Sequence, residues 1–311
     1  MAQLGLPEKE LSIDGLRQAF EKAGYICGDD LIVTVYLALK LEKPLLIEGA
    51  PGVGKTEIAK VLSRVFDTDL IRLQCYEGLD ENKALYEWNY QKQLIKIQLE
   101  KDGSGTAELE RDLFSREYLL ERPLLKAIQA EEKVVLLIDE IDKSDEEFES
   151  FLFELLSDFQ VSVPELGTIQ AHQVPMVVLT SNRARELSDG LKRRCIFLYI
   201  DFPTVEKEYR IIRLKVPEAT ESLARQVARA VHYLRAHLEL RKPPSISETL
   251  DWARALVALG AQQVDPVHLK GTPNILLKNQ DDLQTFHRQL DLKKFWSFVQ
   301  EGEKASGVPG R

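Results

Sequence analysis

Short apolar runs alternate with amphipathic segments over the first two thirds of the chain. The apolar runs occupy residues 45–48, 70–74, 134–138, 176–180 and 195–200. Segments with helical spacing precede or separate them, at residues 31–41, 57–65, 123–131 and 145–158. The run at 134–138 is continuously apolar, as in strands that are covered on both faces. Strands that alternate with helices predict an α/β fold, in which helices flank a parallel sheet.

The pattern changes after residue 203. Helical spacing without strand-like runs covers residues 205–215, 219–237, 247–259 and 292–300, and prolines separate these segments. We therefore predict an α/β core over residues 1–203, a smaller all-helical domain over 204–301 and a flexible tail over 302–311. A length of 311 residues accommodates two domains of ordinary size.

Two insertions interrupt the α/β rhythm. Residues 101–110 read as a polar loop, because they contain glycine, serine and charged residues. Residues 159–173 alternate apolar and polar side chains on both sides of a proline- and glycine-containing turn. That second pattern predicts a β-hairpin.

Composition and charge narrow the class of protein. Hydrophobic residues make up 44% and charged residues 29% of the chain, as in soluble globular proteins. The three cysteines form no CxxC pair, no apolar run approaches the ~18 residues of a membrane span, and the first residues lack a secretory pattern. We expect a soluble cytoplasmic protein without membrane contact. The net charge of −9 argues against coating of nucleic acid, although a local nucleic-acid site stays open.

Residues 49–56 read GAPGVGKT and fit the phosphate-loop pattern GxxxxGK[ST]. They follow a predicted strand and precede a predicted helix, so a glycine-rich turn with a surface lysine is the weaker interpretation. Glycines allow backbone N–H groups to surround phosphate oxygens, and the helix start favours the same anion. Lys55 can reach the outer phosphates, and the Thr56 hydroxyl can bind Mg²⁺. The predicted nucleotide-binding residues of this segment are Pro51, Gly52, Val53, Gly54, Lys55, Thr56 and Glu57.

Polar residues also follow two other predicted strands. Asp139 and Glu140 directly follow the apolar run at 134–138. They thus lie at the carboxyl end of a predicted strand, the position at which α/β sheets bind ligands. Asp139 can hold Mg²⁺ through water, and Glu140 can polarise an attacking water. Asn182 follows the run at 176–180 and can orient that water and contact the outer phosphate. We interpret Asp142, together with the acidic run at 145–147, as the charged start of a helix.

Two arginines precede the last predicted strand. Arg193 and Arg194 could form a surface patch, which is the ordinary interpretation. Alternatively, one of them is an arginine finger that stabilises charge at the nucleotide of a neighbouring subunit. The second interpretation requires an oligomer.

With these motifs the chain resembles the MoxR family of AAA+ ATPases, from about Tyr25 to about Trp296. The resemblance rests on residues 49–56, VVLLIDEIDK at 134–143, the pair Ser181-Asn182 and LSDGLKRRC at 187–195. Residues 70–80 (LIRLQCYEGLD) and 84–90 (ALYEWNY) are similar to a narrower branch, the CoxD-like ATPases of carbon monoxide dehydrogenase maturation.

The resemblance implies an AAA+ core, a helical lid and a ring, usually a hexamer, with ATP and Mg²⁺ bound between core and lid at a subunit boundary. It assigns Lys55 and Thr56 to Walker A, Asp139 and Glu140 to Walker B, and Asn182 to sensor 1. It favours Arg194 over Arg193 as the finger. Tyr25 and Ile26 look like the adenine-contacting linker, although simple packing explains them equally well. The hairpin matches an insert that precedes sensor 1.

One departure from the family concerns sensor 2, an arginine at the start of the third lid helix. Residues 244–249 read PSISET and contain no arginine, and the spacing of Arg241 and Arg254 fits poorly. Sensor 2 is therefore unassigned.

The resemblance implies a chaperone-like ATPase that activates a metalloenzyme client together with a von Willebrand factor A domain protein. Two alternatives stay open. One is a DNA-directed AAA+ motor. The other is a nucleotide-dependent binding switch with slow turnover, which the missing sensor 2 arginine favours.

Overall fold

The computed structural model describes residues 11–99, 113–164 and 166–304. Two compact units divide the chain: Met1–Gly49 with Lys55–Ile200, and Ala50–Gly54 with Asp201–Arg311. The predicted polar loop at 101–110 and residues 305–311 of the predicted tail lie outside the described residues. No helix in the described ranges is both long enough and apolar enough to cross a bilayer.

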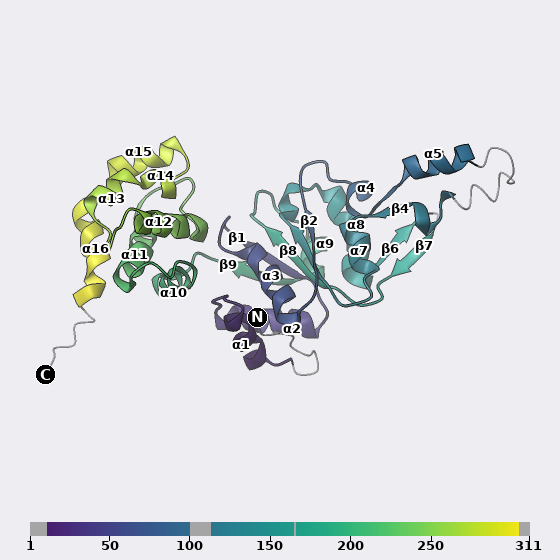
Figure 1. Cartoon of the computed structure of the whole chain (residues 1–311), viewed down its shortest axis with the longest axis horizontal. Coiled ribbons are helices and arrows are strands. Elements are labelled where there is room, and N and C mark those ends of the chain that lie inside the picture. Colours follow the sequence, from purple (N-terminus) through teal and green to yellow (C-terminus); the bar gives the residue numbers. More distant parts are fainter. Residues whose placement is uncertain (1–10, 100–112, 165, 305–311) are drawn as a thin grey trace. The chain divides into compact units, whose positions relative to one another are not determined.

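A parallel sheet forms the centre of the first unit (Figure 1). Its strands, in the spatial order β2-β5-β8-β1-β9, are β2 (Leu70–Gln74), β5 (Val135–Asp139), β8 (Met176–Ser181), β1 (Leu45–Gly49) and β9 (Ile196–Ile200). Each strand lies within one residue of its predicted bounds. The prediction of an α/β fold with a parallel sheet is thus confirmed.

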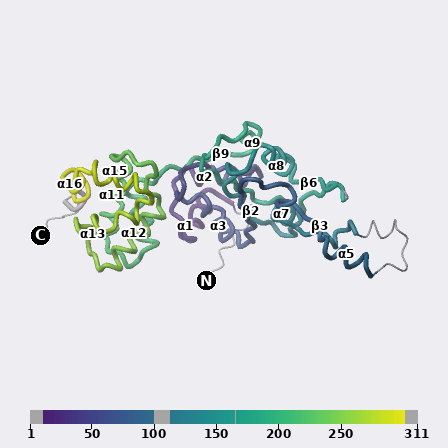
Figure 2. The backbone as a smooth tube through the Cα atoms, turned by 90° about the horizontal axis from the view of Figure 1, so that it is seen from above, coloured from purple at the N-terminus to yellow at the C-terminus, as the bar shows by residue number. Residues whose placement is uncertain are grey.

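Helices cover both faces of this sheet. One set is α1 (Ile13–Lys22), α2 (Asp29–Lys40) and α3 (Lys55–Phe66); the other is α7 (Pro123–Ile128), α8 (Glu146–Asp158) and α9 (Asp189–Arg194). The connection from β1 to β2 runs opposite to the later connections along the sheet. Right-handed crossovers therefore place α3 on the face opposite α8 and α9. In Figure 2, α1, α2 and α3 lie together, apart from α8 and α9.

Alternation along the strands divides the apolar core between the two faces. Leu136 and Ile138 of β5 belong with Leu179 of β8 to the cluster that includes Leu125 and Leu152, from α7 and α8. The intervening strand residues are also buried, and all residues of β5 are buried. The continuous apolar run at 134–138 therefore reflects a strand covered on both faces.

An arm of short elements connects β2 to β5. It comprises α4 (Glu81–Ala84), β3 (Tyr86–Trp88), α5 (Tyr90–Leu99), the 3₁₀ turn η2 (Arg116–Tyr118) and β4 (Leu119–Glu121), and β3 pairs antiparallel with β4. Another 3₁₀ turn, η3 (Ile141–Lys143), follows β5. After α8, β6 (Gln160–Val163) pairs antiparallel with β7 (Gly167–Gln170), which confirms the predicted hairpin. The arm was not predicted.

The second unit is helical over its described residues after Ile200. Its helices are α10 (Val205–Lys215), α11 (Glu221–His237), α12 (Ile246–Ala258), α13 (Pro266–Gly271), α14 (Pro273–Leu276), α15 (Gln280–Gln289) and α16 (Leu292–Lys304). They surround a core that contains Trp252 and Phe295. Arg235 and Glu208 form a buried ion pair at 2.7 Å in this unit. α16 extends to Lys304, into the segment predicted as a tail.

We expect Leu137→Ala in β5 to destabilise the first unit by about 2–5 kcal/mol, because it leaves a cavity beneath a fully buried side chain. Urea unfolding followed by circular dichroism measures this loss. Leu41→Ala is the matched control, because Leu41 is 59% exposed after α2. Equal stability losses in the two variants would contradict the assignment of β5 to the core.

Candidate functional site

Polar side chains meet at the carboxyl ends of β1, β5 and β8. The register places Asp139 of β5 level with Gln74 of β2. On the other side, Ile138 lies level with Leu179, so Asp139 comes next to Thr180 of β8. Since the strands are parallel, residues that are far apart in sequence end at the same edge of the sheet.

The predicted phosphate loop connects β1 to α3. Gly52 and Gly54 have φ angles of 74° and 95°, a region that glycine adopts without the steric cost of a Cβ atom. Lys55 is the first residue of α3. Its ammonium donates to the Gly49 carbonyl at 2.8 Å and to Asn182 Oδ1 at 2.7 Å. Burial lowers the pKa of Lys55, and the charges of Asp142, Asp139 and Glu140 oppose that shift.

Asp139 is buried, and hydroxyl donors reach it from two elements. Thr56 Oγ1 donates to Asp139 Oδ1 at 3.0 Å, and Thr180 Oγ1 donates to the same oxygen at 2.5 Å. Arg72 Nη2 lies 2.5 Å from Asp139 Oδ2. Thr56 and Asp139, the two predicted magnesium ligands, are therefore in direct contact, and their role as ligands stays a prediction.

Magnesium fits this donor set. Mg²⁺ prefers oxygen ligands and is commonly held by one or two carboxylates together with waters and the phosphates of a substrate. The adjacent Thr56 hydroxyl and Asp139 carboxylate supply protein oxygens of this kind. Among the described residues, no three His, Cys, Asp or Glu side chains gather as a metal site by themselves.

Glu140 follows β5 in the left-handed region, with φ 57° and ψ 50°, which is uncommon for a residue with a side chain. Its carboxylate accepts from Gln74 Nε2 at 2.9 Å and from Asn182 Nδ2 at 3.1 Å. Lys143 pairs with it at 2.5 Å. The backbone N–H of Glu140 donates to Thr180 Oγ1 at 2.9 Å. Glu140 is thus held beside Asn182 at the strand ends.

The loop that carries Asn182 is fixed by Asp142. The buried Asp142 carboxylate accepts from the backbone N–H groups of Asn182 at 3.1 Å and Ala184 at 2.8 Å. Asp142 lies in the first turn of η3 rather than at the start of α8, and its carboxylate binds the β8 loop, a role that the interpretation as a helix start did not include. Asp145 does start α8, since its side chain accepts from Phe148 N at 2.8 Å.

Tyr25 and Ile26 lie between α1 and α2 and are half-buried. The Tyr25 ring meets Phe20 edge-on at 5.9 Å. Burial raises the pKa of Tyr25, and the charges of Cys27 and Glu57 add to the rise. Arg64 of α3 donates to the Ala23 carbonyl at 3.2 Å and to Glu57 at 2.7 Å, so the segment is anchored to the helix that follows the loop. The adenine-contacting role stays a prediction.

The two finger candidates differ in their surroundings. Arg194 donates to Ser157 Oγ and to the Gly190 carbonyl, both at 2.8 Å, and its guanidinium lies 4.2 Å from the Phe153 ring centroid. Arg193 is exposed, and the described residues offer it no hydrogen bond or ion pair. Arg194 is thus engaged within its own chain, while Arg193 faces outward.

The start of α12, where the family resemblance implies a sensor 2 arginine, carries no arginine. Ser245 caps this helix, and the Glu248 carboxylate accepts from Ser245 N at 2.9 Å. The flanking arginines have acidic partners: Arg241 pairs with Asp281 at 2.6 Å and Arg254 with Asp251 at 3.0 Å. Sensor 2 stays unassigned.

Four further residues contact the site but were not predicted from the sequence to do so: Arg72, Gln74, Thr180 and Asp142. Arg72 and Gln74 alternate with the buried Ile71 and Leu73 on β2. Two polar residues at i and i+2 of an apolar strand were the available signal.

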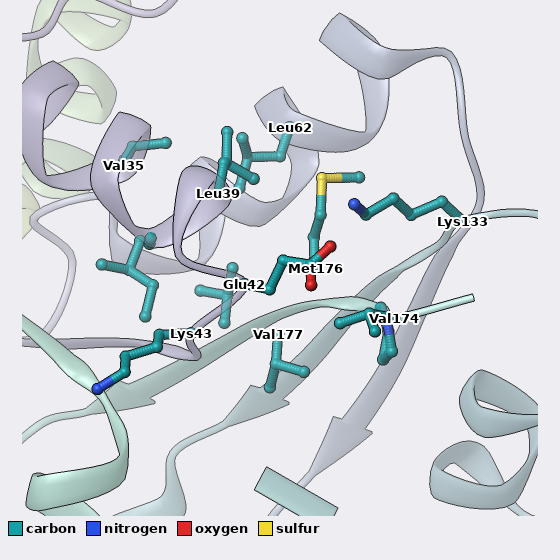
Figure 3. Close-up of a pocket in the computed structure, with 13 residues that line it drawn as sticks. Val35, Leu39, Glu42, Lys43, Leu62, Lys133, Val174, Met176 and Val177 are labelled. Carbon is teal, nitrogen blue, oxygen red and sulfur yellow. The ribbon is translucent and has the colours of Figure 1, made fainter. Parts of the chain in front are cut away.

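Another hollow lies at the opposite, amino-terminal ends of β1 and β8 (Figure 3). Val35, Leu39, Leu62, Met176 and Val177 supply mostly apolar lining, and Lys43 and Lys133 are its basic residues. Glu42 supplies a single carboxylate, and the lining contains none of the hydroxyl and amide side chains of the site at the carboxyl ends. We therefore assign the chemistry to the carboxyl ends.

Comparison with known proteins agrees with this geometry. Residues 44–195 match the model of the AAA domain, dynein-related subfamily. The gas vesicle ATPase GvpN1 of Halobacterium salinarum is 21% identical over 211 residues, which cover 65% of this chain and 59% of that protein. This chain therefore aligns with less than two thirds of that relative's length. The Thermotoga maritima RuvB Holliday junction branch migration motor shares the fold, with a TM-score of 0.50 and 18% identity over 92% of this chain and 79% of that one.

The family prediction is thereby confirmed at the level of the subfamily, while the CoxD-like branch stays a prediction. Residues 44–195, slightly less than half of the chain, thus match an AAA domain of the dynein-related subfamily, the subfamily that contains the MoxR-like ATPases.

Proposed function

We propose that this chain hydrolyses ATP and uses the cycle to remodel or activate a partner protein complex. One observation carries the proposal: hydrogen bonds, two of them through Thr180, connect five polar residues at the carboxyl ends of the parallel strands, namely Lys55, Thr56, Asp139, Glu140 and Asn182. These are the residue types that bind a phosphate, hold a divalent ion and orient a water.

Each residue has a distinct role in this proposal. The backbone N–H groups of the glycine loop and the Lys55 ammonium bind phosphate oxygens. Thr56 and Asp139 would hold Mg²⁺, which neutralises charge on the phosphates when it is bound. Glu140 orients a water and accepts its proton. Asn182 holds the Glu140 carboxylate at 3.1 Å and thereby positions the base.

Surface chemistry supports a protein partner. On α5, Tyr90, Leu94, Ile95 and Leu99 are each more than half exposed. Figure 1 shows this helix extending away from the sheet. Contiguous exposed apolar side chains of this kind mark interaction sites. We propose that α5 contacts the partner.

The partner and the assembly follow from the family resemblance. We propose a ring oligomer, with a hexamer as the expected form, that binds ATP and Mg²⁺. A von Willebrand factor A domain protein and a metalloenzyme client are the proposed partners, as in the CoxD-like branch.

A DNA-directed motor is the second candidate. The structural neighbour RuvB is named as a Holliday junction motor, and α5 carries Lys92 and Lys96. Lys92, however, pairs with Glu117 at 2.8 Å, and the net charge of the chain is −9. We therefore favour a protein partner. A slow binding switch is the third candidate, since the start of α12 carries no arginine.

We expect Glu140→Gln to reduce ATP turnover by roughly 10²- to 10⁴-fold while ATP binding persists, because it removes the base but keeps its shape. Lys55→Met instead weakens binding roughly 10- to 100-fold, since hydrogen bonds to charged groups contribute about 1.5–3 kcal/mol. Phosphate release and equilibrium binding of a fluorescent ATP analogue separate the two effects. Wild-type turnover in Glu140→Gln would contradict the assigned base, and strong stimulation of wild type by DNA would favour the motor.

The exposure of Arg193 favours it as the finger in the proposed ring. Arg193→Ala is expected to lower turnover on the order of 10³-fold, because the finger stabilises charge in the transition state. Arg194→Ala loses contacts to α8 and is expected to reduce thermal stability more than Arg193→Ala does. Activity of rings verified by light scattering is the measurement. Full activity in Arg193→Ala rings would contradict the choice of Arg193.

A further inference from the structure

The edge strand β2 carries two polar residues that no motif assigns, Arg72 and Gln74. β2 ends the sheet order and pairs with β5 alone in the sheet of the described residues. Ile71 and Leu73 are buried in the core, whereas Arg72 and Gln74 are exposed on the other side of the strand. Their side chains nevertheless contact the two carboxylates at the end of β5, since Arg72 reaches Asp139 and Gln74 reaches Glu140.

Arg72 and Gln74 connect the two acidic residues of the site. Arg72 Nη2 lies 2.5 Å from Asp139 Oδ2 and also donates to Gln74 Oε1 at 2.5 Å. Gln74 Nε2 donates to Glu140 Oε2 at 2.9 Å. The proposed metal ligand, Asp139, and the proposed base, Glu140, are thus connected to each other through the edge strand. Whatever moves Arg72 away from Asp139 also removes a partner from Gln74.

Asp139 is much more deeply buried than Arg72, the cation that contacts it. Its side chain is 3% exposed, whereas that of Arg72 is 50% exposed. Thr56 and Thr180 donate hydrogen bonds but supply no charge. A buried carboxylate without a counter-charge is costly, whereas a half-exposed guanidinium returns to water at little cost. The nearby Lys55 ammonium donates to Gly49 and Asn182. Arg72 is therefore a cation in direct contact with Asp139.

We propose that Arg72 is a displaceable counter-cation of Asp139, which competes with the divalent ion of a metal–nucleotide complex for this carboxylate. Arg72 neutralises Asp139 in the nucleotide-free protein and is released when a divalent ion takes its place. Its release also loosens Gln74 from Glu140. Arg72 is thus a positioning residue that sets the magnesium dependence of nucleotide binding. The inference rests on the proposed ATPase function and adds a regulatory residue to the same site.

Competition between Arg72 and a divalent ion for Asp139 determines whether removal of Arg72 strengthens or weakens nucleotide binding. When a side chain of the protein occupies a binding site part of the time, the apparent affinity for the ligand equals the intrinsic affinity multiplied by the fraction of time that the site is free. Removal of the guanidinium therefore strengthens magnesium-dependent binding. An arginine that instead contacted the bound phosphates would have the opposite effect, since its removal would weaken binding.

A magnesium titration tests this sign. Protein freed of metal with EDTA is mixed with a fluorescent, non-hydrolysable ATP analogue, and MgCl₂ is added until binding saturates. For Arg72→Met we expect the half-saturating magnesium concentration to fall by about threefold or more. Arg72→Lys, which keeps the charge, should restore the dependence toward wild type. Arg122→Met is the matched control, because Arg122 forms an exposed ion pair with Glu87 on the arm and lies away from Asp139.

An unchanged or raised half-saturating concentration in Arg72→Met would overturn the inference while leaving the ATPase proposal intact. A wild-type protein that binds no analogue at any magnesium concentration would overturn both. The two failures are therefore distinguishable.

A melting experiment without metal or nucleotide tests the pair itself. Arg72→Met, Asp139→Asn and the double variant form a double-mutant cycle. We expect Arg72→Met to lower the melting temperature by about 2–4 °C and the double variant to lose less than the sum of the single losses. Additive losses would show that Arg72 and Asp139 are not coupled and would overturn the proposal.

Discussion

A buried negative charge organises the site. Asp139 ends a strand that is buried on both faces, so its carboxylate lies where an uncompensated charge is costly. Because β5 lies between β2 and β8, donors reach this carboxylate from both neighbours, Arg72 and Thr180. Thr56 adds a donor from α3. The geometry of the phosphate loop, the edge strand and the β8 loop is thus centred on one side chain.

The same arrangement connects the proposed steps of the reaction. Thr180 contacts both Asp139 and the backbone of Glu140, and Asn182 contacts both Glu140 and Lys55. Lys55 of the phosphate loop is therefore connected to the proposed base, Glu140, through two hydrogen bonds. Such networks act as units, because removal of one member leaves a buried partner unsatisfied.

Much of the fold could be predicted because its signals are local. The apolar runs gave the five strands within one residue, and GAPGVGKT at 49–56 placed the phosphate loop between a strand and a helix. The roles of Arg72 and Gln74 could not be predicted in the same way. They depend on β2 lying beside β5, and strand order is set by tertiary packing. The arm was missed because β3 and β4 have three residues each and pair across a long separation. The contacts of Arg194 with α8 likewise arise only after α9 packs.

The proposed chemistry depends on a nucleotide bound at this edge of the sheet. Isothermal titration calorimetry of wild-type protein with a non-hydrolysable ATP analogue, with and without magnesium, measures that binding. We expect about one analogue per chain, with tighter binding when magnesium is present. If protein that is folded by circular dichroism shows no detectable binding at saturating analogue and magnesium, no nucleotide site exists at this edge.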